Sequence, residues 1–123
     1  MDSKTVFELR NEAKDLSGVE KLNKLNNALG IARKLYSDEP YDDWIQKAFA
    51  WVLIDLCKHY ITDNNLNQAG TCYRQLSTID FQGYEDEIIE SQKNFLRPKI
   101  DTNYSEVHKA EELSNLKISL RKF

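Results

Sequence analysis

Apolar residues recur along most of this chain at intervals of three and four positions, the spacing that places side chains on one face of an α-helix. No stretch shows the strict alternation of apolar and polar residues that is typical of a half-buried strand. The pattern predicts an all-α protein with about six helices, joined by connections of a few residues so that neighbours pack antiparallel. We expect the helices at residues 4–15, 17–39, 41–62, 66–79, 84–97 and from 103 onward.

Capping residues and prolines indicate where several of these helices begin and end. Ser17 and Glu20 have the spacing of a capping box, in which each side chain accepts a hydrogen bond from a backbone N–H group of the first turn. Pro40 is expected to end the second helix. Pro98 is expected to end the fifth helix at Arg97, because the residue before a proline avoids the helical conformation.

Residues 48–57 are apolar at almost every position, so this part of the third helix lacks a polar face. A helix that is apolar all round is usually buried all round, and we therefore expect the third helix to be the central one. Asp55 is the exception within the run, and a buried carboxylate needs a partner or a proton. The candidate partners are Arg33 and Lys34 on the preceding helix and His59 one turn further on.

The third and fourth helices also carry the residues of a known repeat pattern. A tetratricopeptide repeat has two large positions, a small one and an aromatic one on its first helix, then a small and an aromatic position on its second. Leu53, Leu56, Cys57 and Tyr60 occupy the first set here, Ala69 and Tyr73 occupy the second, and Phe81 stands where the repeat has proline. Residues 50–83 thus resemble a tetratricopeptide repeat, and Ala28, Ala32 and Pro40 resemble the second half of an earlier copy.

This resemblance implies a fold of antiparallel helical hairpins stacked as a short solenoid of about six helices, and a plain helical bundle is the alternative architecture. The small residues Cys57 and Ala69 would let two helix axes approach closely, and Tyr60 and Tyr73 would fill the space between hairpins. Tetratricopeptide proteins are similar in holding a partner's peptide in a concave groove. The resemblance therefore implies a protein–protein interaction module, a scaffold or adaptor without catalytic activity.

The composition fits one domain over residues 1–123 and narrows the classes of partner. The chain is 41% hydrophobic and has only four Gly and two Pro, which suits long helices better than a β-sandwich or barrel. Its net charge of −3 argues against nucleic-acid binding. Residues 93–123, which include Lys117 and Arg121, are locally basic, with seven Lys and Arg against four Asp and Glu. A nucleic-acid-associated helical domain that uses this segment is the alternative function.

The sequence contains no pattern that is typical of an enzyme or a cofactor site. It has no Gly-rich phosphate loop, no G-x-S-x-G and no H-E-x-x-H. Cys57, His59 and Cys72 are the best set of metal ligands, but a structural zinc site needs four. Cys57 and His59 also point away from each other, since they are two positions apart on a helix. We therefore predict no catalysis, no metal and no cofactor.

The same sequence features bear on where the protein is located. Two cysteines do not make a disulfide framework, and the first residues lack the apolar core of a signal peptide. The longest apolar run, residues 48–54, is far shorter than a membrane span. We expect a cytoplasmic protein that does not contact a membrane.

Trp44 and Trp51 lie seven positions apart, hence on one side of the third helix, and Tyr41 directly precedes that helix. These aromatic side chains either pack in the core or form a partly exposed ridge that anchors a peptide or a helix, and the pattern leaves both open. They and three charged residues are our candidates for partner binding: Tyr41, Trp44, Trp51, Asp55, Lys117 and Arg121.

The last expected helix is apolar over an unusually broad surface near the end of the chain. One neighbouring helix cannot cover apolar residues on several sides. We expect this helix to be an open end that self-associates or packs on a following domain of a larger polypeptide. Its apolar residues are Val107, Ala110, Leu113 and Leu116 on one side, and Ile118, Leu120 and Phe123 on others.

Overall fold

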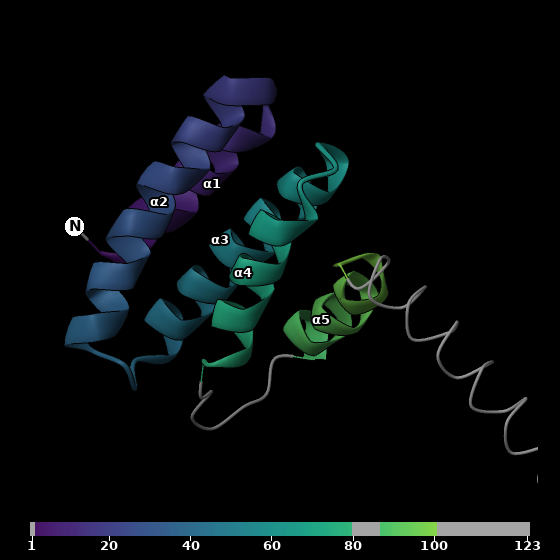
Figure 1. The fold of residues 1–123 in the computed structure, drawn as a ribbon. Coiled ribbons are helices and arrows are strands. Elements are labelled where there is room, and N and C mark those ends of the chain that lie inside the picture. Colours follow the sequence, from purple (N-terminus) through teal and green to yellow (C-terminus); the bar gives the residue numbers. More distant parts are fainter. Residues whose placement is uncertain (1, 80–86, 101–123) are drawn as a thin grey trace, which may run out of the picture.

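The computed structural model describes residues 2–79 and 87–100, and all regular structure in these ranges is α-helical (Figure 1). The helices are α1 (Ser3–Lys14), α2 (Gly18–Asp38), α3 (Asp43–Thr62), α4 (Leu66–Ser77) and α5 (Glu87–Ile100). The all-α prediction is confirmed for these ranges, and the first four predicted helices agree closely with α1 to α4. The sixth predicted helix, from residue 103 onward, lies outside the described residues.

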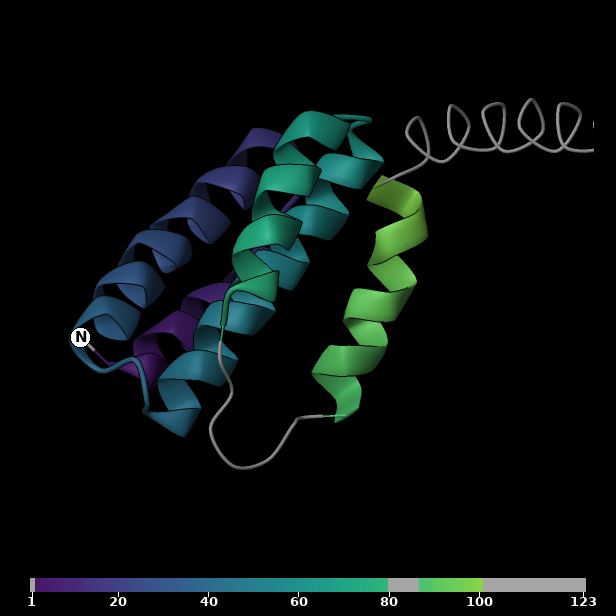
Figure 2. The same cartoon turned by 60° about the horizontal axis from the view of Figure 1, so that its bottom comes forward.

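Successive helices run in opposite directions and lie side by side as hairpins (Figures 1 and 2). α1 and α2 form the first hairpin, α3 and α4 form the second, and α5 lies beside the second hairpin on the side away from the first. α3 contacts each of the four other described helices, whereas the backbone of α5 approaches only α3 and α4 within these ranges. The prediction that the third helix is central is therefore confirmed.

The hydrophobic core surrounds α3, as its all-round apolar run predicted. Within residues 48–57 only Trp51 and Asp55 keep part of their surface in solvent. The apolar faces of the neighbouring helices close over α3, and burial of apolar surface is the main term that stabilises such a fold. The side chains that meet there include Val6 and Ala13 of α1, Leu25 and Ala28 of α2, Leu76 of α4, and Ile89 and Leu96 of α5.

Gln46 is a fully buried polar residue at the end of the first turn of α3, and the apolar pattern did not single it out. Its side-chain amide Nε2 donates a hydrogen bond of 2.8 Å to the carbonyl oxygen of Pro40. A buried amide without a partner would destabilise the fold, so this bond both satisfies Gln46 and fixes the connection between α2 and α3.

Three helices begin with a side-chain cap, but the capping box predicted at Ser17 and Glu20 is wrong. Ser17 makes no side-chain hydrogen bond to the first turn of α2. The residue after it, Gly18, has φ of 59°, and this left-handed backbone departs from the helical geometry that a capping box needs directly after its first residue. The observed caps are the side chains of Asp2, Asp42 and Asn65. Their oxygens accept hydrogen bonds from the backbone N–H groups of Thr5 at 3.1 Å, Ile45 at 3.0 Å and Gln68 at 3.3 Å, respectively.

The end predicted for the fifth helix at Arg97 is also wrong, because α5 continues through Pro98 to Ile100. Pro98 removes a single backbone donor, and it does so in the last turn, where few further hydrogen bonds depend on it. Packing favours the extra turn, because Ile100 is half-buried beside Gly70 of α4. Its Cγ2 atom is so near Gly70 that a Cβ atom added to this glycine would lie 3.6 Å away, at van der Waals contact. Contact between α4 and α5 thus outweighs the local preference.

The two glycines of α2 should respond to alanine in opposite directions. Gly30 has helical φ and open space around its Cα, so Gly30→Ala should raise the free energy of unfolding by about 0.5–1 kcal/mol. Gly18 has φ of 59°, which disfavours a Cβ, so Gly18→Ala should lower it by about 1 kcal/mol. Urea denaturation followed by circular dichroism measures both. Equal effects of the two substitutions would contradict the assigned backbone at Gly18.

Candidate functional site

An exposed aromatic cluster covers the side of α3 that faces α1. Tyr41 is 73% exposed and Trp44 is 64% exposed, so neither belongs to the core. The Trp44 ring meets Phe7 of α1 edge-on, with ring centroids 6.5 Å apart at 86°, and Lys47 Nζ lies 5.1 Å from the centre of the Trp44 ring. Trp51 is half-buried on the same side of α3. We call Phe7, Trp44 and Trp51 the aromatic face, and the exposed Tyr41 precedes it in the connection before α3.

Arg10 of α1 connects the aromatic face to the carboxylate of Asp55. Its guanidinium carbon lies 4.6 Å from the centre of the Trp51 ring, a cation–π contact. Its Nε donates to Oδ2 of Asp55, and its Nη2 lies 3.4 Å from Oδ1, so both carboxylate oxygens are engaged. The two side chains are 18% and 19% exposed, which means that this ion pair lies at the edge of the core.

The partners predicted for Asp55 on the preceding helix, Arg33 and Lys34, are therefore wrong. Both lie on the exposed surface of α2, and Arg33 reaches across to Gln75 of α4, where its Nη2 donates a hydrogen bond of 2.7 Å. Sequence reasoning missed Arg10 because it lies 45 positions from Asp55. The available signal was weak: Arg10 follows Phe7 by three positions and so shares its side of α1.

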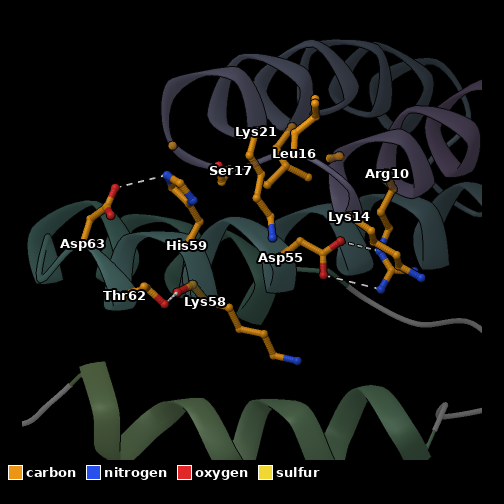
Figure 3. A pocket seen from close by; sticks show the side chains of 13 residues that line it. Arg10, Lys14, Leu16, Ser17, Lys21, Asp55, Lys58, His59, Thr62 and Asp63 are labelled. Carbon is orange, nitrogen blue, oxygen red and sulfur yellow. Dashed lines mark hydrogen bonds and ion pairs between the residues drawn. The ribbon is translucent and has the colours of Figure 1, made fainter.

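A hollow of about 290 Å³ lies next to this ion pair, between α1, the start of α2 and the second half of α3 (Figure 3). Four basic side chains line it, and Lys21 extends from α2 toward α3 between His59 and Asp55 in that view. The basic hollow, as we call it, is lined by Arg10, Lys14, Lys21 and Lys58, together with Ser17, Gly18, Asp55, His59 and Asp63 among others.

Both carboxylates of the basic hollow have a partner, whereas its three ammonium groups pair with no carboxylate of the described residues. Asp55 is held by Arg10, and Oδ2 of Asp63 lies 3.1 Å from Nε2 of His59. Only 8% of the His59 side chain is exposed. Within residues 2–79 and 87–100, no carboxylate lies in salt-bridge contact with Lys14, Lys21 or Lys58. The hollow thus concentrates positive charge, although residues 1–92 carry ten Lys and Arg against sixteen Asp and Glu.

The two cysteines meet inside the second hairpin. Cys57 Sγ donates to the carbonyl oxygen of Ala69 at 3.5 Å, and both thiols are free and buried. A hydrogen bond between the thiols raises the pKa of Cys57 well above its usual value, and burial adds to the effect. The same hydrogen bond lowers the pKa of Cys72, against the opposite effect of burial. The pair therefore loses a first proton much more readily than a second.

The structure brings His59 neither to these thiols nor to Asp55, for which it was also a predicted partner, since His59 contacts Asp63 and the ring of Tyr60. No group of three or more His, Cys, Asp and Glu side chains that could hold a metal ion occurs among the described residues. Of the six candidates for partner binding, Trp44, Trp51 and Asp55 share the α1 side of α3, and Tyr41 is exposed just before this helix. The other two, Lys117 and Arg121, lie outside the described ranges, as does most of the basic segment 93–123.

Comparisons with known proteins add no assignment. No protein-family model matches the chain, and neither a curated protein nor a solved structure matches it. In the part of the chain that the structure describes, none of the helices combines the length and the apolar character needed to cross a membrane.

Proposed function

We propose that this chain is a protein-interaction module that binds its partner on the aromatic face between α1 and α3. The observation that carries the proposal is the position of Trp44, which is 64% exposed on the central helix. Tryptophan buries more apolar area than any other residue when a partner covers it, and it is strongly enriched among the residues that dominate binding energy.

The surroundings of Trp44 support a binding role. Phe7 meets the Trp44 ring edge-on and Lys47 lies near its centre, so the conformation of Trp44 is partly fixed before a partner arrives. Less conformational entropy is then lost on binding. Tyr41, three positions before Trp44, is a further exposed aromatic residue, and the Arg10–Asp55 pair supplies polar groups beside Trp51. A hydrophobic centre with a polar rim is the usual composition of a protein–protein interface.

We propose in addition that the helices stack in the tetratricopeptide manner, that the chain is not an enzyme and that it is cytoplasmic. Stacking of the tetratricopeptide type is supported by the contacts of α3 with α1 and α5, and by the close packing of Cys57 on Ala69. A non-catalytic role is supported by the absence of catalytic motifs from the sequence. A cytoplasmic location is supported by the low number of cysteines, which suits a reducing compartment.

The aromatic face can be tested by comparing proteins that co-purify with the wild type and with Trp44→Ala. We expect Trp44→Ala to weaken capture of the specific partner at least about tenfold, since truncation of a central interface tryptophan typically costs 2 kcal/mol or more. Thermal melting should change little, because Trp44 is mostly exposed.

The matched control is Val19→Ala, which truncates another exposed apolar residue, 72% exposed, at the start of α2. The control should retain the same partner at wild-type level. Partners that bind equally well to all three proteins would refute a binding role of the aromatic face.

A further inference from the structure

We propose that the basic hollow binds a phosphorylated serine or threonine side chain of the protein partner that occupies the aromatic face. This inference rests on the proposed function, because the aromatic face supplies the rest of the contact. It concerns the chemistry of the partner, which the aromatic face alone does not define.

The charge balance of the hollow points to a multiply charged anion. Arg10 pairs with Asp55 and Asp63 lies beside His59, whereas Lys14 and Lys21 line the hollow without a carboxylate partner among the described residues. Lys58 also lines the hollow, but its ammonium group points away from α1 and α2 (Figure 3). A phosphorylated side chain carries a charge of about −1.5 to −2 at pH 7 and three acceptor oxygens, so it can accept from several ammonium groups at once. A single carboxylate would leave part of this positive charge unbalanced.

The shape of the site adds to the charge argument. A concave surface excludes part of the solvent and so strengthens the field of its charges, whereas isolated surface lysines are screened by water and salt. Ser17 and Gly18 line the same hollow, and Ser17 leaves the backbone N–H groups at the start of α2 uncapped. These groups can donate to phosphate oxygens in addition to the lysines.

The position of the hollow identifies the source of the phosphate as a protein segment. The hollow and the aromatic face lie on the same α1–α3 side and share Arg10, which contacts both Trp51 and Asp55. Trp44 and Lys58 are fourteen positions apart on α3, which is about 21 Å at 1.5 Å per residue. An extended peptide covers that distance in about six residues. We therefore infer a partner segment with an apolar residue about six positions from the phosphorylated one.

The test measures backbone amide chemical shifts of the full chain by NMR during titration with three small probes: N-acetyl phosphoserine amide, N-acetyl glutamate amide and inorganic phosphate. We expect phosphoserine to shift the amides of residues 14–21 and 55–63 saturably. N-acetyl glutamate amide should bind more weakly than phosphoserine. Inorganic phosphate should also bind more weakly than phosphoserine, because the proposed ligand is a phosphorylated side chain. Lys21→Gln should weaken phosphoserine binding at least about fivefold, because it removes a charged hydrogen-bond donor from the lining of the hollow.

Lys24→Gln is the matched control, because Lys24 lies one turn further along α2 and pairs with Glu12 at 3.2 Å, outside the hollow. It removes the same charge and should leave phosphoserine binding unchanged. The inference is overturned if phosphoserine causes no saturable shifts, or if Lys24→Gln weakens binding as much as Lys21→Gln does. Tighter binding of inorganic phosphate than of phosphoserine would also overturn it, since the site would then serve a free anion.

A final arm separates this inference from the proposed function. A peptide with phosphoserine and tryptophan six positions apart should bind more tightly than N-acetyl phosphoserine amide, and Trp44→Ala should abolish only that gain. If the peptide binds the wild-type chain no more tightly than N-acetyl phosphoserine amide does, the aromatic face alone is contradicted. Peptide binding that depends on Trp44 but not on the phosphate would contradict the phosphate site alone.

Discussion

Replacing Leu56 with alanine should lower the free energy of unfolding by about 2–5 kcal/mol. Leu56 is fully buried on α3, the helix that contacts every other described helix. Truncation removes apolar atoms from the core and leaves a cavity that the surrounding side chains fill only in part, because several helices pack on this region and none can move in without losing other contacts. Urea denaturation followed by circular dichroism at 222 nm measures the change.

Val19→Ala provides the reference for Leu56→Ala, since Val19 is 72% exposed and its truncation should alter the free energy of unfolding by less than about 0.5 kcal/mol. The slope of the denaturation curve should stay the same for both variants, which would show that the folded and unfolded states keep their compactness. A change below about 1 kcal/mol for Leu56→Ala would contradict the central role of α3.

The helices themselves could be predicted because their signals are local. The spacing of apolar residues located α1 to α4, and the all-round apolar run of residues 48–57 identified α3 as the central helix. Each of these features depends on residues within a few turns of one another. Pro98 shows the limit, since its local preference for ending the helix is outweighed by the packing of Ile100 beside Gly70, a contact between distant positions.

The candidate site was predicted only in part, because it is made from residues of several helices. The seven-residue spacing of Trp44 and Trp51 fixes the side of α3 on which they lie but not what covers that side. Phe7 meets one edge of the Trp44 ring, while Arg10 lies over Trp51 and leaves it half-buried. The basic hollow left no signal in the sequence, since its lysines come from α1, α2 and α3 and are separated by acidic residues along the chain.

Replacing Ala69 with leucine should lower the free energy of unfolding by about 1–3 kcal/mol through overpacking. Ala69 is fully buried on α4, and its carbonyl oxygen lies 3.5 Å from Cys57 Sγ on α3. A leucine at this position needs space that α3 occupies, so the two helices must separate or the side chain must adopt a strained rotamer. The same denaturation experiment measures the loss.

The neighbouring exposed position provides a control for the Ala69 substitution, and Cys57 provides a test of its cause. Gln68→Leu introduces the same side chain on the outer surface of α4 and should change the free energy of unfolding by less than about 0.5 kcal/mol. If the overpacking is against Cys57, then Cys57→Ala should relieve part of it, and the double variant should lose less stability than the sum of the two single variants. Strict additivity would mean that Ala69 and Cys57 do not share the contact between α3 and α4, and the close approach of the two helices at these small residues would have to be abandoned.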